Sequence, residues 1–227
     1  MPTAPPRSTD DLSTAAFPPP GVSHVVFDVV GTLVEPAPSV AVAYARAAAR
    51  HGVEAFPDDL RRRFAAAWRR QEEIDAAATP PFATSRTRER DRWRGIVHDV
   101  FDAAPAERRE RIFLDLWGHF AVPESWRPLD AGTRLVRAAL DAGCGVALAS
   151  NFDERLVPLA ACLEPLSLAG WVFTSSDVGW RKPAPQFFRA IERRLGRGPD
   201  ELLLVGDDPL LDVAAATAAG WRSFAVG

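Results

Sequence analysis

The chain has 227 residues, enough for one large domain or for a core domain with an insertion. Its composition, with 47% hydrophobic and 25% charged residues, is that of a globular protein and not of a disordered one. The net charge of -3 predicts no general attraction to nucleic acid or acidic membranes, and no apolar run approaches the ~20 residues of a membrane span.

The N-terminal residues 1–20 form the first predicted segment. They contain no apolar stretch typical of a secretory signal, and their Pro, Ser, Thr and Ala content predicts a flexible tail. The two cysteines, Cys144 and Cys162, occur in apolar patterns, and we expect buried thiols rather than a disulfide. Together these features predict a cytoplasmic protein.

The first regular element is a buried strand that begins at Val22. The run VSHVVFDVV is short, β-branched and apolar, and it ends in a turn at Gly31. The stretch 36–127 contains no convincing strand. Its four helical patterns are at 38–51, 57–78, 85–102 and 106–120. A helical block at this place predicts an insertion into a core that consists of 21–35 and 128–227.

Strands and helices alternate in the second half of the chain. Further strands are expected in GVALASN from Gly145, WVFTSSD from Trp171, LLLVGD from Leu202 and SFAVG at the C-terminal end. The helical patterns between them span 130–142, 153–163, 184–196 and 209–219. This alternation predicts an α/β fold with a Rossmann-like parallel sheet and helices on both faces.

Ligands bind at the carboxyl ends of the strands in a sheet of this kind, so the residues there are the candidate site. They are Asp28 with Val30 and Gly31, Ser150 with Asn151, Lys182, and the group Asp207, Asp208 and Asp212. Carboxylates this close would repel one another and raise their pKa values unless a cation lies among them, and Mg²⁺ suits such oxygen ligands. Simpler roles are also open. Ser-Asn after a strand is a common helix N-cap, and Asp208 and Asp212 suit the start of a helix.

The ordered segments FDVVGTL, ASN, KPAP and VGDDPLLD resemble the four motifs of the haloacid dehalogenase superfamily. The resemblance covers nearly all of 22–227, and the insertion at 36–127 is similar to the helical cap that these proteins often carry. More narrowly, SNFDERL, WRGIV and KPAPQFF resemble the subgroup of haloacid-dehalogenase-like domain-containing protein three.

The resemblance implies a role for each candidate residue. Asp28 would be the nucleophile that forms an aspartyl-phosphate. Gly31, Ser150, Asn151 and Lys182 would bind the phosphoryl group, with Ser150 and Lys182 also taking part in catalysis. Mg²⁺ would be held by Asp28, the backbone carbonyl of Val30 and Asp207. Asp208 would share or take the Asp207 role, and Asp212 would orient Lys182 or metal-bound water.

Val30 departs from the family pattern, because phosphatases of this superfamily have a second aspartate there that acts as general acid and base. Loss of such a group typically costs about 10²–10⁴-fold in rate. One explanation is a slow or specialised phosphohydrolase that acts on esters with good leaving groups or borrows an acid from the cap. The candidate donors in the cap are Glu72, His98 and His119.

Two further explanations stay open. In a 2-haloacid dehalogenase the halide leaves without protonation, and Trp68-Arg69-Arg70-Gln71 is similar to the cap arginine segment of such enzymes, although the acidic group at 207–212 argues against a metal-free site. The third explanation is a catalytically degenerate binding protein. In either enzyme the expected partner is a small phosphorylated or halogenated molecule, with neither nucleic acid nor membrane.

Other site classes lack their sequence patterns. The four histidines do not have the HExxH spacing of zinc hydrolases, and neither a G-x-x-x-x-G-K-[ST] nor a G-x-S-x-G segment occurs. Most of the seven tryptophans are expected to pack in the core and the cap. Trp180, just before Lys182, is the one expected to line the cleft beneath the cap.

Overall fold

The computed structural model describes residues 17–226, and a five-stranded parallel sheet forms their centre. The strands are β1 (His24–Phe27), β4 (Gly145–Ser150), β5 (Trp171–Thr174), β6 (Leu202–Gly206) and β7 (Arg222–Ala225). They lie in the order β5-β4-β1-β6-β7, so β1 is the central strand. The predicted α/β fold with a parallel sheet is therefore confirmed.

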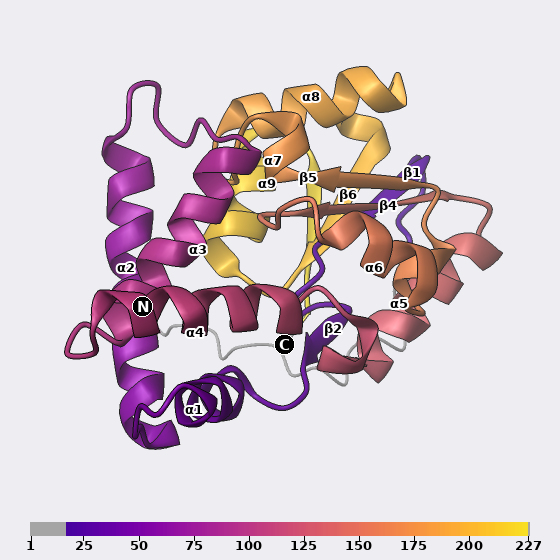
Figure 1. Ribbon diagram of the computed structural model, residues 1–227. Coiled ribbons are helices and arrows are strands. Elements are labelled where there is room, and N and C mark those ends of the chain that lie inside the picture. Colours follow the sequence, from indigo (N-terminus) through magenta and orange to yellow (C-terminus); the bar gives the residue numbers. More distant parts are fainter. Residues whose placement is uncertain (1–16, 227) are drawn as a thin grey trace, which may run out of the picture.

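Helices cover both faces of this sheet, as Figure 1 shows. They are α5 (Asp130–Asp141) and α6 (Leu156–Cys162) on one face, and α8 (Pro185–Leu195) and α9 (Ala215–Ala218) on the other. Successive strand side chains point to opposite faces, so Val25 and Phe27 pack toward α5 and α6, while Val26 packs toward α8 and α9. Burial on both faces explains why the strand sequences are continuous apolar runs.

The chain between β1 and β4 contains a block of four helices, which we call the cap. They are α1 (Val40–Arg50), α2 (Pro57–Ala77), α3 (Arg86–Val100) and α4 (Ala106–His119). They lie together beside the sheet in Figure 1 and share a core of their own, in which Tyr44, Ile96 and Phe113 are almost completely buried. The cap therefore has a packed interior separate from that of the sheet.

Two short strands at the ends of the cap were missed in the sequence. β2 (Val34–Pro36) and β3 (Trp126–Pro128) pair antiparallel, with Val34 opposite Pro128. Strands of three residues are too short to show an alternating pattern. Their pairing brings the two ends of the cap to one place next to the carboxyl end of β1.

Short helical turns complete the described chain: η2 (Pro123–Ser125), η3 (Leu166–Leu168), α7 (Ser175–Val178), η4 (Pro199–Glu201) and the π-helical η5 (Pro209–Ala214). The helix expected at 209–219 is therefore divided into η5 and α9, and the one expected at 153–163 begins only at Leu156. Cys162 is exposed and Cys144 half-buried, so the expectation of two buried thiols was wrong, although both are free.

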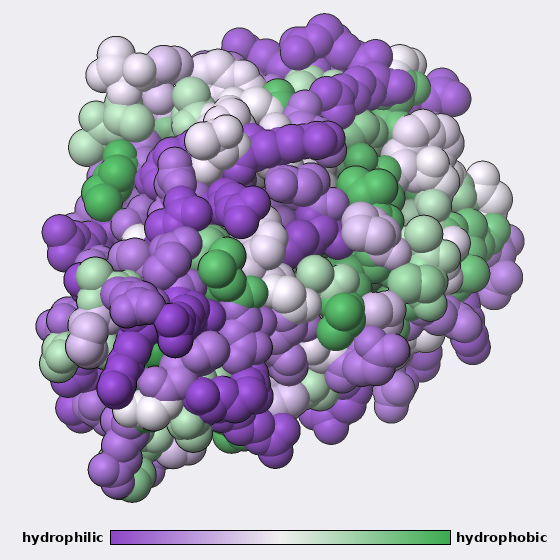
Figure 2. All heavy atoms as spheres, viewed as in Figure 1, coloured by the Kyte–Doolittle hydropathy of each residue, from purple (hydrophilic) through white to green (hydrophobic). Residues whose placement is uncertain are grey.

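The predicted tail, 1–20, lies mostly outside the described residues, which begin at Phe17. The Phe17 ring packs edge-on against Phe224 with centroids 5.4 Å apart, so the packed chain begins before Val22. Across residues 17–226, no helix has both the length and the hydropathy to cross a bilayer. Figure 2 shows hydrophilic residues over most of the cap face, whereas hydrophobic ones gather toward α6, where Val157 is exposed.

Candidate active site

Asp28 directly follows β1 and lies at the carboxyl end of the central strand. Its backbone N–H donates to the Val205 carbonyl on β6 at 2.8 Å, so the sheet holds this residue rigidly. Its side chain is buried, and its Oδ1 accepts a hydrogen bond from Lys182 Nζ at 2.7 Å. The same ammonium donates to Asp212 Oδ1 at 2.5 Å. Lys182 therefore joins two carboxylates that belong to different strand ends.

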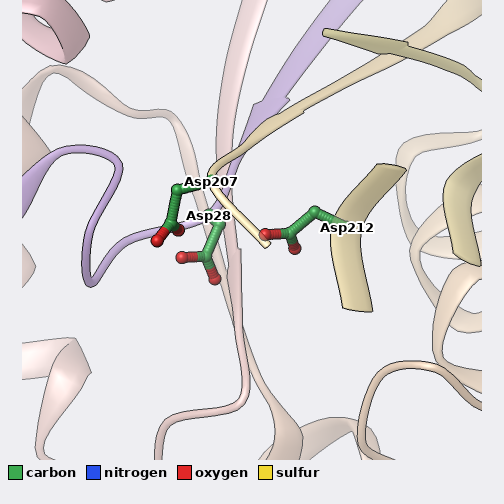
Figure 3. Close-up of side chains that lie close together, drawn as sticks. All are labelled: Asp28, Asp207 and Asp212. Atoms are coloured by element: carbon green, nitrogen blue, oxygen red, sulfur yellow. The ribbon is translucent and has the colours of Figure 1, made fainter. Parts of the chain in front are cut away.

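Three carboxylates converge at this point, as Figure 3 shows. One oxygen from each of Asp28, Asp207 and Asp212 lies within 4.8 Å of the other two. Asp207 follows β6 directly, and Asp212 projects back toward it from η5. We call these three residues the acidic cluster. An ionised cluster has three negative charges, against the one positive charge of Lys182, and oxygen donors of this kind suit a divalent cation such as Mg²⁺.

The pKa values in the cluster reflect this excess of negative charge. Burial raises the pKa of Asp28 to about 6, against the opposing effect of the Lys182 charge, and Asp212 and Asp207 contribute to the rise. Burial also raises the pKa of Asp207, although a Thr32 hydrogen bond opposes it. Burial by itself would lower the pKa of Lys182, but Asp28 and Asp212 raise it overall. The lysine is therefore charged, and the carboxylates lack enough positive charge around them.

The turn after β1 holds Asp207 in place. Thr32 Oγ1 donates to Asp207 Oδ1 at 3.1 Å. Gly31 has φ +91°, and a Cβ at this position would lie 2.3 Å from Asp207 Oδ2. Only glycine combines that backbone angle with so close an approach. Thr32 was not among the residues selected from the sequence, because nothing local connects it with a carboxylate 175 residues later.

Asp208 and Asp207 have different surroundings although they are neighbours in sequence. Asp208 Oδ1 accepts hydrogen bonds from the backbone N–H groups of Leu210 and Leu211, both at 2.8 Å, so it is the N-cap of η5. The Asp208 N–H in turn donates to Asp212 Oδ2 at 3.1 Å. Of the two neighbours, Asp207 is thus the one that joins Asp28 in the acidic cluster.

Asn151 has a side-chain contact that the sequence did not indicate. Its amide Nδ2 donates to the Lys182 carbonyl at 2.9 Å, and its Oδ1 accepts from the Lys182 backbone N–H at 2.7 Å. This pair of hydrogen bonds fixes the backbone that carries the lysine. Ser150, the last residue of β4, is buried and lines the same cavity as Asp28.

Residues 22–220 match the model of the haloacid dehalogenase-like hydrolases. The chain belongs to this hydrolase family. It is 30% identical over 206 residues to the human haloacid dehalogenase-like hydrolase domain-containing protein 3. The matched region covers 89% of this chain and 80% of the relative.

The chain is also similar to proteins that are named for a specific activity. A phosphoglycolate phosphatase from Shigella boydii is 32% identical over 223 residues, 89% of this chain and 80% of the relative. The solved structure of an L-2-haloacid dehalogenase has a TM-score of 0.67 at 18% identity, covering 91% of this chain and 86% of the other. The second comparison concerns the fold alone. The chain is thus similar in sequence to a phosphatase and similar in fold to a dehalogenase.

Val30 lies between Asp28 and Gly31, and its half-buried side chain lines the cavity. The family resemblance implies a second aspartate, acting as general acid and base, at this position in phosphatases. An isopropyl group can neither donate nor accept a proton. Proton transfer at this position is therefore absent, whereas the backbone carbonyl of Val30 is unaffected by the change of side chain.

A cavity of about 600 Å³ lies between the cap and the carboxyl ends of the strands, and we call it the cap chamber. Asp28, Ser150, Lys182 and Asp207 line it on the core side. Its other walls are mainly aromatic: Tyr44, Phe64, Trp68, Trp93, Phe113, Trp117, Phe120, Trp126 and Phe152. These walls are therefore suited to bind an apolar part of a ligand.

The tryptophans of this chamber differ from the sequence expectation. Trp180 does not line it and packs instead with the apolar residues beneath α8. The chamber is lined by Trp68, Trp93, Trp117 and Trp126, which were expected to be packing residues. Trp180 was expected there because it lies just ahead of Lys182, but its segment bridges to Ala83 and its side chain packs with the core instead. Helical spacing did not reveal the other four, because it is the same for a residue that faces a core and one that faces a cavity.

The three cap residues expected as proton donors do not line the chamber. Its lining, drawn from residues 17–226, lacks Glu72, His98 and His119. Glu72 pairs with Arg92, and His98 Nε2 lies 3.2 Å from Glu110 Oε2. His119 Nδ1 lies 3.1 Å from the Ser125 hydroxyl. The hypothesis that one of these residues replaces the missing acid is therefore not supported by their positions.

Proposed function

We propose that this chain is a Mg²⁺-dependent phosphohydrolase of low or specialised activity that forms an aspartyl-phosphate on Asp28. The observation that supports it most is the convergence of the acidic cluster on Lys182 at the end of the central strand. A buried ammonium flanked by carboxylates is suited to neutralise charge on a phosphoryl group. Relatives described as phosphatases make the assignment consistent with the family.

The two oxygens of Asp28 have different surroundings. Lys182 donates to Oδ1, which leaves Oδ2 as the oxygen that attacks phosphorus. Attack forms the Oδ2–P bond and breaks the bond between phosphorus and the ester oxygen, which leaves with the electron pair. Water then attacks phosphorus, releases inorganic phosphate and restores the carboxylate. Lys182 and the Ser150 hydroxyl stabilise the phosphoryl oxygens in both steps.

Asp28, Asp207 and the carbonyl of Val30 would hold the cation. Their fit to Mg²⁺ is supported by the geometry, since oxygens of Asp28, Asp207 and Asp212 lie within 4.8 Å of one another. Burial and the neighbouring carboxylates raise the pKa values of Asp28 and Asp207, as expected for a cluster without a cation. A Mg²⁺ ion held there would supply positive charge and Lewis-acid polarisation of the phosphoryl group. Asp212 keeps Lys182 in position from the opposite side.

A second candidate is a 2-haloacid dehalogenase, in which Asp28 attacks carbon. Two observations favour it: the walls of the chamber are apolar, and Arg69 of α2 lines it. A halide needs no proton when it leaves, so Val30 would be no defect. The acidic cluster favours the phosphohydrolase, because a metal-free carbon displacement has no use for Asp207.

Turnover assays separate these functions. Release of phosphate from 4-nitrophenyl phosphate and of halide from 2-chloropropionate is measured for the wild type and Asp28→Asn, with Mg²⁺ and with EDTA. Asp200→Asn, an exposed aspartate on η4, is the matched control. Phosphate release that requires both Mg²⁺ and Asp28 supports the proposal.

Two other results would overturn it. Halide release that persists in EDTA assigns the chain to the dehalogenases. Binding of inorganic phosphate and Mg²⁺ by calorimetry, with no turnover of either substrate, assigns it to catalytically degenerate binding proteins.

A further inference from the structure

The cap chamber and Val30 together restrict the substrate of the proposed phosphohydrolase, on which the following inference rests. We infer that the substrate is a phosphate monoester of a phenol, with its aromatic ring in the cap chamber and its phenolate leaving without protonation. Two independent observations support this substrate class. They are the composition of the chamber walls and the positions of the proton donors around the site.

Aromatic side chains of the cap and the core form two groups in the chamber. In the cap, the Trp68 ring lies 6.0 Å from Phe64 and 5.7 Å from Trp93, measured between centroids. In the core, the Trp126 ring lies 5.6 Å from Phe152. Rings at these separations offer edges and faces to a further ring, and each such pair contributes about 0.5–1.5 kcal/mol beyond the burial of its area.

The aromatic walls of the chamber are unsuited to a sugar or another polyol. Two arginines also line it: Arg69 is an exposed residue of α2, and the Arg155 guanidinium is paired with the buried Asp153 through two hydrogen bonds of 2.7 Å. Substrate hydroxyls facing the aromatic walls would lose their water without gaining partners, which costs about 1–3 kcal/mol for each group. The volume of about 600 Å³ is ample for a substituted one- or two-ring aromatic group.

The positions of the proton donors limit the leaving group. The carboxylates that line the chamber are all on the core side, in the segment 207–212 or at Asp28. Among residues 17–226, the cap contributes neither a carboxylic acid nor an imidazole to the lining. Its hydroxyl is that of Tyr44, and burial raises the pKa of that group above its ordinary value. Among the described residues, the cap therefore contributes to the chamber no acid stronger than a buried phenol.

An ester oxygen that is not protonated must leave as an anion. A phenol has a pKa of about 10, as in tyrosine, whereas an aliphatic alkoxide is nearly as basic as hydroxide, whose conjugate acid water has a pKa of about 15.7. Phenolate is thus the better leaving group by several pKa units, and it takes its proton from water after departure. The aromatic walls and the missing acid consequently favour the same class of ester.

A series of esters tests the leaving group. Phosphate release from 4-nitrophenyl, phenyl, 2-naphthyl and n-butyl phosphate is measured with Mg²⁺ for the wild type and Val30→Asp. For the wild type we expect kcat/KM to fall as the alcohol becomes more basic, with butyl phosphate at least about 10²-fold below phenyl phosphate. Val30→Asp restores a proton donor and is expected to raise turnover of butyl phosphate about tenfold or more.

Binding to an inactive variant tests the chamber without turnover. Asp28→Asn is expected to bind 2-naphthyl phosphate at least about tenfold more tightly than butyl phosphate by calorimetry. Adding Trp68→Leu should remove most of that difference. Trp171→Leu, at the start of β5 and outside the chamber, should keep it.

The outcomes distinguish failure of this inference from failure of the proposed function. Equal kcat/KM for butyl and phenyl phosphate would overturn the inference that the substrate is a phosphate monoester of a phenol, and so would equal binding of the butyl and naphthyl esters. The proposed phosphohydrolase function would be unaffected by either result. No phosphate release from any ester would overturn the phosphohydrolase and the inference with it.

Discussion

Replacing Glu89 with glutamine perturbs a buried contact between the cap and the loop that carries Lys182. Glu89 lies on α3 and is 0% exposed. It accepts hydrogen bonds from Arg181 Nη1 at 2.7 and 2.6 Å and from the Ser175 hydroxyl at 2.8 Å. Arg181 immediately precedes the lysine, so this ion pair joins a cap helix to the loop that carries Lys182.

The expected loss of stability follows from the burial of both partners. Removing one member of a buried ion pair typically costs about 3–5 kcal/mol, because the other charge is left without compensation. Glu72 and Asp75 lie 3.6 Å from the Arg181 guanidinium and offset part of the loss. We therefore expect about 3 kcal/mol for Glu89→Gln, the lower end of the range. In a protein of this size that lowers Tm by about 6–12 °C.

Thermal and urea unfolding measure this difference, with Glu107→Gln as the control. Glu107 pairs with Arg111 one turn along α4, and both side chains are more than half exposed. Its loss should cost less than about 0.5 kcal/mol. Arg181→Met alone leaves the buried Glu89 carboxylate without its ion-pair partner. The double variant Glu89→Gln with Arg181→Met should therefore be more stable than Arg181→Met. If Glu89→Gln loses no more stability than Glu107→Gln, the reasoning from burial is refuted.

Three other predictions concern the site. Because burial raises the pKa of Asp28 to about 6, its ionisation destabilises the cation-free protein as pH rises through that value. The increase in Tm caused by Mg²⁺ should therefore be larger at pH 7.5 than at pH 5, and an equal increase would contradict this. Gly31→Ala places a Cβ against Asp207 in a left-handed backbone, so it should cost about 1–3 kcal/mol of stability and weaken Mg²⁺ binding in calorimetry. Asn151→Ala removes both hydrogen bonds to the Lys182 backbone, so in phosphate-release assays kcat should fall by a larger factor than KM changes. A change in KM alone would show that Asn151 acts only in binding.

The sheet and the residues at its strand ends could be predicted from the sequence because their signals are local. β1 is a continuous apolar run, and Asp28 at its end is a conspicuous exception to that run. Parallel strands bring their carboxyl ends to one edge, so order along the chain was enough to place Asp28 and Lys182 in one candidate site. Their contact at 2.7 Å joins residues 154 positions apart.

Contacts between distant polar side chains could not be predicted in the same way. Nothing around Glu89 indicates that its partner is Arg181, 92 residues later, and α3 resembles a solvated charged helix in sequence. The Ser150-Asn151 sequence is typical of a helix N-cap, but the Asn151 side chain bonds to the Lys182 backbone. The identity of such partners depends on the packing of the cap against the core, which periodicity does not encode.

Two arginines of the core contact the cap on different helices, and together they connect the chamber with Lys182. Arg181 pairs with Glu89 on α3, while Arg155 donates to the Trp117 carbonyl on α4 at 3.1 Å and lies 3.6 Å above its ring. Trp117 lines the chamber, and Arg181 is bonded through the backbone to Lys182. A shift of the cap would therefore alter the aromatic walls and the lysine position together. If Asp28 and Lys182 act as proposed, the same buried contacts would couple substrate fit in the chamber to charge neutralisation at Asp28, and a ligand that fills the chamber would also stabilise the position of the ammonium.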